Sequence, residues 1–153
     1  MNSSETFKEL LALCVCLGLR KTSRRVTRMY DDALRPIGLR STQLPILVAL
    51  SLARSLPMST LADQLEMDRT TLTRNLRPLA KRGLVEIVGG QDKRTRKVRL
   101  TLLGQEIADR AVPLWEKAQR YALEALGSDR LQELHDTMSE LLSLADRGRE
   151  GVL

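Results

Sequence analysis

Basic and hydroxyl side chains that can bind a polyanion are concentrated in the stretch DRTTLTRNLRPLAKR at residues 68–82. Wound as a helix at about 100° per residue, this stretch separates into an apolar arc and a basic arc. The apolar arc consists of Leu72, Leu76 and Leu79. The basic arc consists of Arg69, Thr70, Thr73, Arg74, Arg77 and Lys81, with no acid among them. The opposite-charge pairs expected on a merely solvated helix face are therefore missing, and arginine with threonine favours contacts to phosphate oxygens and base edges of DNA.

A second group of cations lies in GGQDKRTRKVRLT at 89–101, which carries five cations against one acid, Asp92. The two glycines begin a turn between runs of β-favouring residues at 84–88 and 96–101, so we expect a two-stranded hairpin. A basic hairpin directly after a DNA-reading helix is typical of a wing, whose tip can reach phosphates or a minor groove. Its candidate DNA-binding residues are Lys93, Arg94 and Arg96. A solvated tip remains the alternative for any basic hairpin.

Two cysteines, Cys14 and Cys16, are candidates for redox chemistry. Arg20 follows Cys16 by one helical turn, close enough to favour the reactive thiolate. On a continuous helix the two cysteines would lie about 200° apart, which makes a disulfide within one chain sterically poor and leaves an intersubunit disulfide open. The alternative is that a free cysteine in an apolar helix serves as a small hydrophobic residue.

Catalytic signals are weak in this chain. Its one histidine, His135, has no cysteine or acidic cluster that the sequence places beside it. Glycine-rich phosphate loops, C-x-x-C pairs and nucleophile elbows are missing from the sequence. We therefore expect no enzyme activity, no metal and no cofactor.

Charge and hydropathy limit the partners. Residues 1–56 and 57–101 each carry a net charge of +5, whereas residues 102–153 carry −4, within an overall +6. This division predicts a polyanionic partner that binds to only one part of the molecule. The longest apolar run, LLALCVCLGL at 10–19, is too short to cross a bilayer and lacks a secretory cleavage site. We therefore expect no membrane association, a cytoplasmic location and reduced cysteines.

Segments that are predicted to be helical precede and include the basic residues, and these helices must position them. The sequence predicts one long helix at about 6–34, ended by Pro36 and Gly38, and a second at about 41–53 with Ser41 as its cap. A short helix capped by Ser59 follows. Asp68 is then expected to cap the basic helix, which Gly83 ends in a left-handed conformation. Two short helices joined by a tight turn form a helix-turn-helix.

The last third of the chain returns to helix. Thr101 can cap a helix to about Leu126, and a second helix begins at Gly127-Ser128. The second helix repeats apolar residues at three- and four-residue steps, at Leu131, Leu134, Met138, Leu141 and Ala145. Such helices at both termini of a small winged domain have little core of their own to cover, so they favour a shared dimer interface.

At this point the chain resembles the MarR-type (multiple antibiotic resistance regulator) winged-helix transcription factors over almost its whole length. DKRTRKVRLT at 92–101 resembles the wing signature of that family, and MDRTTLTRNLRPLAKRGLV at 67–85 resembles its recognition helix and following strand. The resemblance implies a homodimer whose terminal helices interlock and a pseudopalindromic double-stranded DNA operator. By motif position it implies that Arg94 enters the minor groove, and that Asp92 structures the wing without touching DNA.

The resemblance also implies release of the operator by a ligand or an oxidant. Many relatives bind small phenolic or carboxylate compounds in a cleft beside the dimer helices. Arg24 and Arg28 are candidates for that cleft, and a helix surface near DNA is the alternative. In the branch of the family that senses organic hydroperoxides, the reactive cysteine falls at Cys16 and a tyrosine that bonds to it falls at Tyr30. The other two tyrosine positions of that branch read Arg20 and Ser41 here.

The sequence thus predicts a mainly α fold with a small β-wing, a winged helix-turn-helix flanked by dimerisation helices. Residues 1–38 form the N-terminal dimerisation helix, 39–101 the DNA-binding domain and 102–153 the C-terminal dimerisation helices. The expected function is that of a homodimeric DNA-binding transcriptional regulator, a repressor released by ligand or thiol oxidation. A winged-helix dimer that acts as a protein adaptor without an operator is the alternative. The basic arc disfavours it, because a protein-binding face should carry aromatic or apolar anchors.

Overall fold

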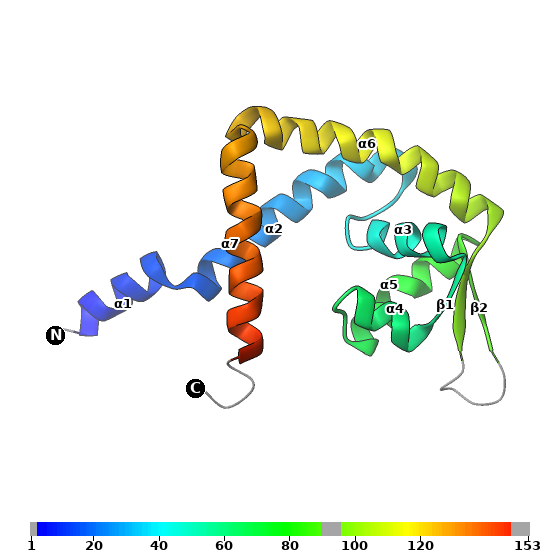
Figure 1. Cartoon of the computed structure of the whole chain (residues 1–153), viewed down its shortest axis with the longest axis horizontal. Helices are drawn as coiled ribbons and strands as arrows, with labels where there is room; N and C mark the ends of the chain where they lie inside the picture. The colour runs from blue at the N-terminus through cyan, green and yellow to red at the C-terminus, as the bar shows by residue number, and fades with distance from the viewer. Residues whose placement is uncertain (1–2, 90–95, 148–153) are drawn as a thin grey trace. The chain divides into compact units, whose positions relative to one another are not determined.

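The computed structural model describes residues 3–89 and 96–147, and the chain divides into two compact units, Met1–Trp115 and Glu116–Leu153 (Figure 1). The first unit contains the helix-turn-helix and its small sheet. The second contains the end of one long helix and the whole of the last. Among the described residues, the helices are all too short or too polar to span a membrane.

The N-terminal segment forms two helices, α1 (Ser3–Leu13) and α2 (Val15–Leu34), so the prediction of one continuous helix is wrong. Cys14 separates them in an extended conformation, with φ −66° and ψ 111°. Its amide still closes α1 on the Leu10 carbonyl at 3.2 Å, and its carbonyl starts α2 by accepting from Gly18 at 2.9 Å. Cysteine, valine and glycine are weaker helix formers than the leucines before them, which explains why the break falls here.

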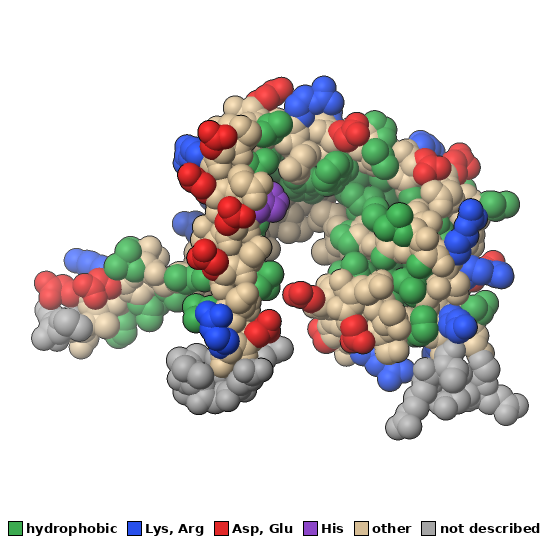
Figure 2. All heavy atoms as spheres, viewed as in Figure 1, with side chains coloured by type: hydrophobic (Ala, Val, Ile, Leu, Met, Phe, Trp, Pro, Cys, Tyr) green, Lys and Arg blue, Asp and Glu red, His purple; other side chains and the backbone are tan. Residues whose placement is uncertain are grey.

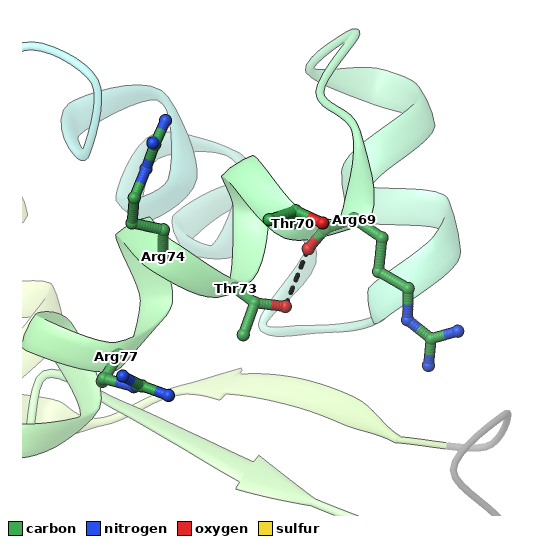
Figure 3. Close-up of a pocket in the computed structure, with 5 residues that line it drawn as sticks. All are labelled: Arg69, Thr70, Thr73, Arg74 and Arg77. Carbon is green, nitrogen blue, oxygen red and sulfur yellow. Dashed lines mark hydrogen bonds between the residues drawn. The ribbon is translucent and has the colours of Figure 1, made fainter.

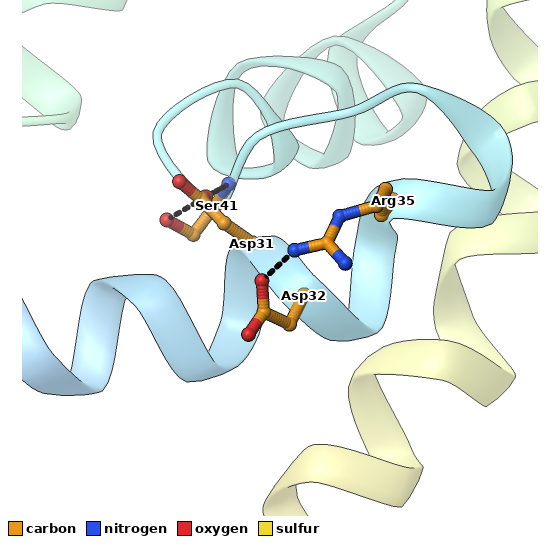
Figure 4. A network of polar contacts seen from close by, with 4 residues as sticks. All are labelled: Asp31, Asp32, Arg35 and Ser41. Atoms are coloured by element: carbon orange, nitrogen blue, oxygen red, sulfur yellow. Dashed lines mark hydrogen bonds and ion pairs between the residues drawn. The ribbon is translucent and has the colours of Figure 1, made fainter.

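The connection after α2 is a short 3₁₀ turn, η1 (Arg35–Ile37), ended by Gly38 in the left-handed region at φ 65°. The next helix, α3, spans Leu44–Ala53, and Gln43 occupies its N-cap position. Ser41 was expected to cap this helix, and that prediction is wrong. Its backbone amide and its hydroxyl both donate to Asp31 Oδ1 of α2, at 2.6 and 2.8 Å (Figure 4).

The helix-turn-helix consists of α4 (Met58–Gln64) and α5 (Arg69–Lys81). Pro57 is the N-cap of α4, so the predicted cap at Ser59 is wrong. The predicted cap of α5 is confirmed, because Asp68 accepts from the Thr71 amide at 2.8 Å. Gly83, with φ 69°, follows α5 in the predicted left-handed conformation.

The sheet has three antiparallel strands in the order β1-β3-β2, where β1 is Ser55–Pro57, β2 is Val85–Val88 and β3 is Lys97–Leu100. The pairing of β2 with β3 confirms the predicted hairpin, with Val85 opposite Leu100 and Val88 opposite Lys97. The prediction missed β1, which pairs with the other side of β3. This places β3 at the centre, and its Val98 is fully buried in the core.

The core of the first unit consists of aliphatic side chains from the end of α2, the connection that follows it, α3, α4, α5, the sheet and α6 (Leu102–Leu126). The fully buried members include Leu50 of α3, Leu61 of α4 and Val98 of β3. Thr101 caps α6 as predicted, by accepting from the Gly104 amide at 2.9 Å, while its hydroxyl contacts the Gly83 carbonyl at 2.7 Å. One side chain thus fastens α6 to the end of α5.

The second unit consists of the later turns of α6 and α7 (Ser128–Arg147). Gly127, at φ 80°, lies between the two helices as predicted. None of the described residues of α7 is buried. Its exposed apolar residues include Leu134, Met138, Leu142 and Leu144.

Candidate nucleic-acid interface

The outer face of α5 carries the predicted reading residues. They line an open hollow of about 450 Å³, formed by Arg69, Thr70, Thr73, Arg74 and Arg77. All five are exposed. Figure 3 shows Arg69, Arg74 and Arg77 extending from the helix in different directions around Thr73. The structure therefore brings these five predicted residues together on one surface.

Burial of the opposite face explains why this surface points outward. Leu72, Leu76 and Leu79 are each 0% exposed, as the apolar arc predicts. They fix α5 against the core, so the residues between them face solvent. The Thr73 hydroxyl donates to the Arg69 carbonyl at 2.7 Å, one turn earlier on the same helix (Figure 3).

The first turn of α5 is held by Asp68. Its carboxylate accepts from the Thr71 hydroxyl at 2.7 Å and from the Thr71 amide at 2.8 Å. These bonds, the hydroxyl first and the amide second, lower the pKa of the Asp68 carboxyl. A charged Asp68 therefore stabilises the helix end that carries Arg69 and Thr70.

The electrostatics of the face favour an anionic partner. In the described part of the chain, no carboxylate forms a salt bridge with Arg74 or Arg77. The salt bridge of Arg99 with Glu86 joins β3 to β2 instead. Guanidinium groups without a carboxylate partner can form charge-assisted hydrogen bonds to phosphate, or bidentate bonds to guanine in a major groove.

The wing contributes one described candidate residue. Arg96 is exposed just before β3, and its carbonyl accepts from the Met58 amide at 3.0 Å, which ties the base of the hairpin to α4. The other predicted wing residues, Asp92, Lys93 and Arg94, lie outside the described residues.

The candidate redox residues all lie near or on α2. Cys14 is half-buried and Cys16 exposed, and both are free thiols. Because Cys14 lies between two helices, the 200° separation expected on a continuous helix does not apply. Arg20 follows Cys16 by one turn on the same face. Tyr30 lies 14 residues beyond Cys16, roughly 21 Å along the helix, so the two cannot bond within one chain. Burial raises the pKa of the Tyr30 phenol.

The candidate ligand residues are both exposed on α2. Arg28 lines an open, polar hollow of about 480 Å³, together with Asp31, Asp32, Arg35 and Arg40. Arg24 is not among the residues that line it. The structure therefore places Arg28, but not Arg24, at this hollow.

The sequence pattern did not single out two polar residues of the α5 region, Asn75 and Arg82. Both bond to the connection between α2 and α3, as Thr42 Oγ1 donates to Asn75 Oδ1 at 2.8 Å and Arg82 donates to the Ile37 carbonyl at 2.9 Å. Their partners lie more than thirty residues earlier in the chain. No short-range sequence signal could have revealed them.

Metal binding is not indicated in the part of the chain that the structure describes. Its His, Cys, Asp and Glu side chains form no group of three that could hold an ion. His135 contacts the Leu131 carbonyl one turn earlier through Nδ1, at 2.8 Å. This is a local helix contact.

Known proteins share this fold. The model that describes the MarR family matches residues 37–95. The transcriptional regulator MosR of M. tuberculosis, solved in complex with DNA, is 35% identical at a TM-score of 0.79, with 89% of this chain and 98% of that chain covered. No curated protein sequence matches the chain.

Two more distant structures share the fold. A cysteine-to-serine mutant of MarR from E. coli, complexed with operator DNA, is 24% identical at a TM-score of 0.75, with 87% of this chain and 98% of that chain covered. The transcriptional repressor CouR bound to p-coumaroyl-CoA is 21% identical at a TM-score of 0.78, with 87% of this chain and 94% of that chain covered.

Proposed function

This chain belongs to the MarR family of DNA-binding transcriptional regulators, and from that premise we propose that it is a homodimeric repressor of a pseudopalindromic operator. The observation that carries the proposal is the outward face of α5, where arginines and threonines line an open hollow and none of the described residues that line it is acidic. In a two-fold dimer, two such helices enter successive major grooves about one helical turn apart. Arg94 of the wing contacts the flanking minor groove.

Exposed apolar surface at both ends of the chain supports the dimer. On α1, Phe7, Leu11 and Leu13 are 65%, 70% and 75% exposed, and Figure 2 shows hydrophobic side chains over the surface of this helix. Large exposed patches of this kind mark association surfaces. We assign residues 1–38 and 102–153 to dimerisation, and residues 39–101 to DNA binding.

Release of the operator has two candidate triggers. One is a small phenolic or carboxylate ligand that binds near Arg24 and Arg28. This route is supported by CouR, which has the same fold and was solved with bound p-coumaroyl-CoA. The other is oxidation of Cys16 by an organic hydroperoxide. The exposure of Cys16 and the cation of Arg20 one turn away support that second route.

The alternative function is that of an adaptor that binds a protein through the same surface. The outer face of α5 argues against it, because its described residues offer cations and hydroxyls instead of the aromatic or apolar anchors of protein interfaces. Catalysis and membrane attachment do not enter the proposal. We place the regulator in the cytoplasm.

Titration of the purified protein with DNA from its own promoter region tests the proposal. Binding is measured at several salt concentrations against random DNA of the same length, with and without organic hydroperoxide, and repeated with Cys16→Ser. We expect specific binding with a steep salt dependence. If oxidation is the trigger, hydroperoxide releases the wild type from the DNA but not the variant.

Each remaining outcome selects among the candidates. Specific binding that is indifferent to hydroperoxide removes the thiol route and leaves the ligand route. If the promoter DNA and a sequence selected from a random pool both bind no better than random DNA, the repressor proposal fails and the adaptor gains support.

A further inference from the structure

The connector between α2 and α3, residues 35–43, holds α5 at two separate points. The first is Arg82, the residue that ends α5. Its guanidinium donates through Nη2 to the Ile37 carbonyl at 2.9 Å and through Nη1 to the Gly38 carbonyl at 2.5 Å. Because the carbonyls belong to the end of η1, this bidentate contact fastens the last turn of α5 to the connector.

The second point is Asn75, two turns earlier on α5. Its Oδ1 accepts from the Thr42 hydroxyl at 2.8 Å, while its Nδ2 donates to the Thr71 carbonyl of its own helix at 3.0 Å. The amide group of Asn75 is therefore bonded on one side to the connector and on the other to the first turns of α5, which carry the reading residues.

The connector is in turn bonded to α2. Asp31 of α2 accepts from the amide and the hydroxyl of Ser41, the residue next to Thr42 (Figure 4). Hydrogen bonds thus link α2 to Ser41 and Thr42 to Asn75, and the peptide bond between Ser41 and Thr42 joins the two. The salt bridge between Asp32 and Arg35 lies beside this path but does not join it to α5.

Asn75 and Arg82 are placed where they can control the orientation of α5. They are seven residues apart, so they lie on nearly the same side of α5, outside the basic arc and beside the buried leucines. Hydrophobic contacts are non-directional and allow a helix to roll or slide, whereas hydrogen bonds fix distance and angle. Two such attachments, one at the middle of the helix and one at its C-terminal end, define its roll about its own axis.

We infer that Asn75 and Arg82 are positioning residues that set the orientation of α5 for DNA, and that the connector 35–43 couples α5 to α2. The inference rests on the proposed function, since it assigns to α2 the route by which a release signal reaches the reading helix. A displacement of the last turn of α2 moves Ser41, and the bonds of Thr42 and Arg82 carry that movement to α5.

Four variants of the full-length protein test this route. Arg82→Gln and Asn75→Ala remove the two attachments directly. Asp31→Ala removes both bonds between α2 and Ser41, to the amide and to the hydroxyl, without changing any residue that bonds to α5. Arg35→Gln is the matched control, because it deletes an exposed connector arginine whose partner, Asp32, belongs to α2.

The first readout is amide hydrogen exchange in the free protein, well below its melting temperature. We expect faster exchange at residues 72–81 in Arg82→Gln, Asn75→Ala and Asp31→Ala, with unchanged exchange at residues 107–111 of α6 and no effect of Arg35→Gln. The response to Asp31→Ala is decisive. If exchange in α5 is unchanged in that variant, α2 is not coupled to α5 through the connector, whatever the protein binds.

The second readout is the ratio of affinities for the selected operator and for random DNA. We expect Arg82→Gln and Asn75→Ala to lower that ratio about tenfold while the salt dependence stays that of the wild type. A smaller salt slope in Arg82→Gln would make Arg82 a phosphate contact and overturn its positioning role. An unchanged ratio would overturn it as well.

The two proposals fail separately. If the wild type itself shows no preference for any DNA sequence, the proposed function fails. Hydrogen exchange still decides in that case whether the connector links α2 to α5.

Discussion

At the scale of single residues, α5 separates side chains that hold the helix from side chains that are available to a partner. Leu72 and Leu76 are completely buried, whereas Arg74 and Arg77 of the same helix are exposed. Substitutions on the exposed face should therefore change binding without unfolding the domain, since surface changes of this kind usually alter the free energy of unfolding by less than about 0.5 kcal/mol.

Arg74→Ala should lose sequence discrimination. If Arg74 contacts a base edge, the variant loses about 1–3 kcal/mol of preference for the operator over an operator changed at one base pair. Arg94→Ala is the contrasting variant, which should weaken binding to all sequences and lower the slope of log affinity against log salt by about 1. Competition titrations with both DNAs measure the two effects. Two variants that both bind the operator as well as the wild type would refute the assignment of these arginines.

Asp68 should make the stability of the domain depend on acid. Its folded-state pKa is lowered, so its stabilising contribution is complete above the ordinary aspartate pKa of about 3.9 and is lost as the pH falls through the lower folded-state value. Asp68→Ala should therefore melt at a lower temperature than the wild type at pH 7, and the difference should shrink as the pH falls below about 4. Thermal melts of both proteins between pH 7 and pH 3 measure this difference in melting temperature.

Asp68→Asn provides the control, because asparagine is also a good N-cap but carries no charge. It should retain most of the melting temperature at pH 7. A difference between wild type and Asp68→Ala that stays constant down to pH 3 would exclude the carboxylate as its cause.

At the scale of elements, the junction of α6 with the end of α5 depends on Gly104. A Cβ atom built at this position would lie 2.0 Å from the Leu84 carbonyl oxygen and 2.8 Å from Leu100 Cδ1. The first of these is a backbone atom, so α6 itself would have to move away. The helix can approach the strand this closely because residue 104 has no side chain.

Gly104→Ala should accordingly destabilise the protein by about 3 kcal/mol or more, at the upper end of the range for overpacked sites. Gly18→Ala in α2 is the matched control, since a Cβ there meets no described atom within 4 Å. It should leave stability unchanged or raise it by about 0.5–1 kcal/mol through helix propensity. Chemical denaturation of both variants measures their free energies of unfolding. Equal values for Gly104→Ala and Gly18→Ala would show that α6 can shift at no cost.

Elements that depend on local signals were predictable from the sequence. Asp68 and Thr101 cap the helices they were expected to cap, and the arc of buried leucines fixes which face of α5 is exposed. The strand β1 was missed because three residues carry no periodicity, and its partner β3 lies some forty residues later. The contacts of Asn75 and Arg82 were missed for the same reason: they depend on tertiary packing that brings distant residues together.

At the scale of the whole molecule, apolar side chains remain on the surface of one chain, at α1, the start of α2, and α7. Leu11 is 70% exposed on α1 and Leu142 is 55% exposed on α7. A monomer rarely leaves so many large apolar side chains in contact with water. The proposed dimer accounts for them.

Leu11→Glu and Leu142→Glu should each weaken the dimer at least about tenfold, because a buried carboxylate in an apolar interface is costly. Sedimentation across a concentration series gives the dissociation constant. Leu52→Glu is the control, since Leu52 is 85% exposed on α3, within the proposed DNA-binding domain. Masses that are equal in all three variants and the wild type would place the interface elsewhere. The dimer variants should also lose operator affinity, because half of the two-site contact is lost.

The central position of β3 has a mechanical consequence. Its ladder bonds run to β1 on one side and to β2 on the other, and it leads directly into the capped start of α6. Tension applied along this strand loads both ladders in shear, so that many bonds must break together instead of one after another. Force applied to β3 is therefore shared by both neighbouring strands and passes into α6.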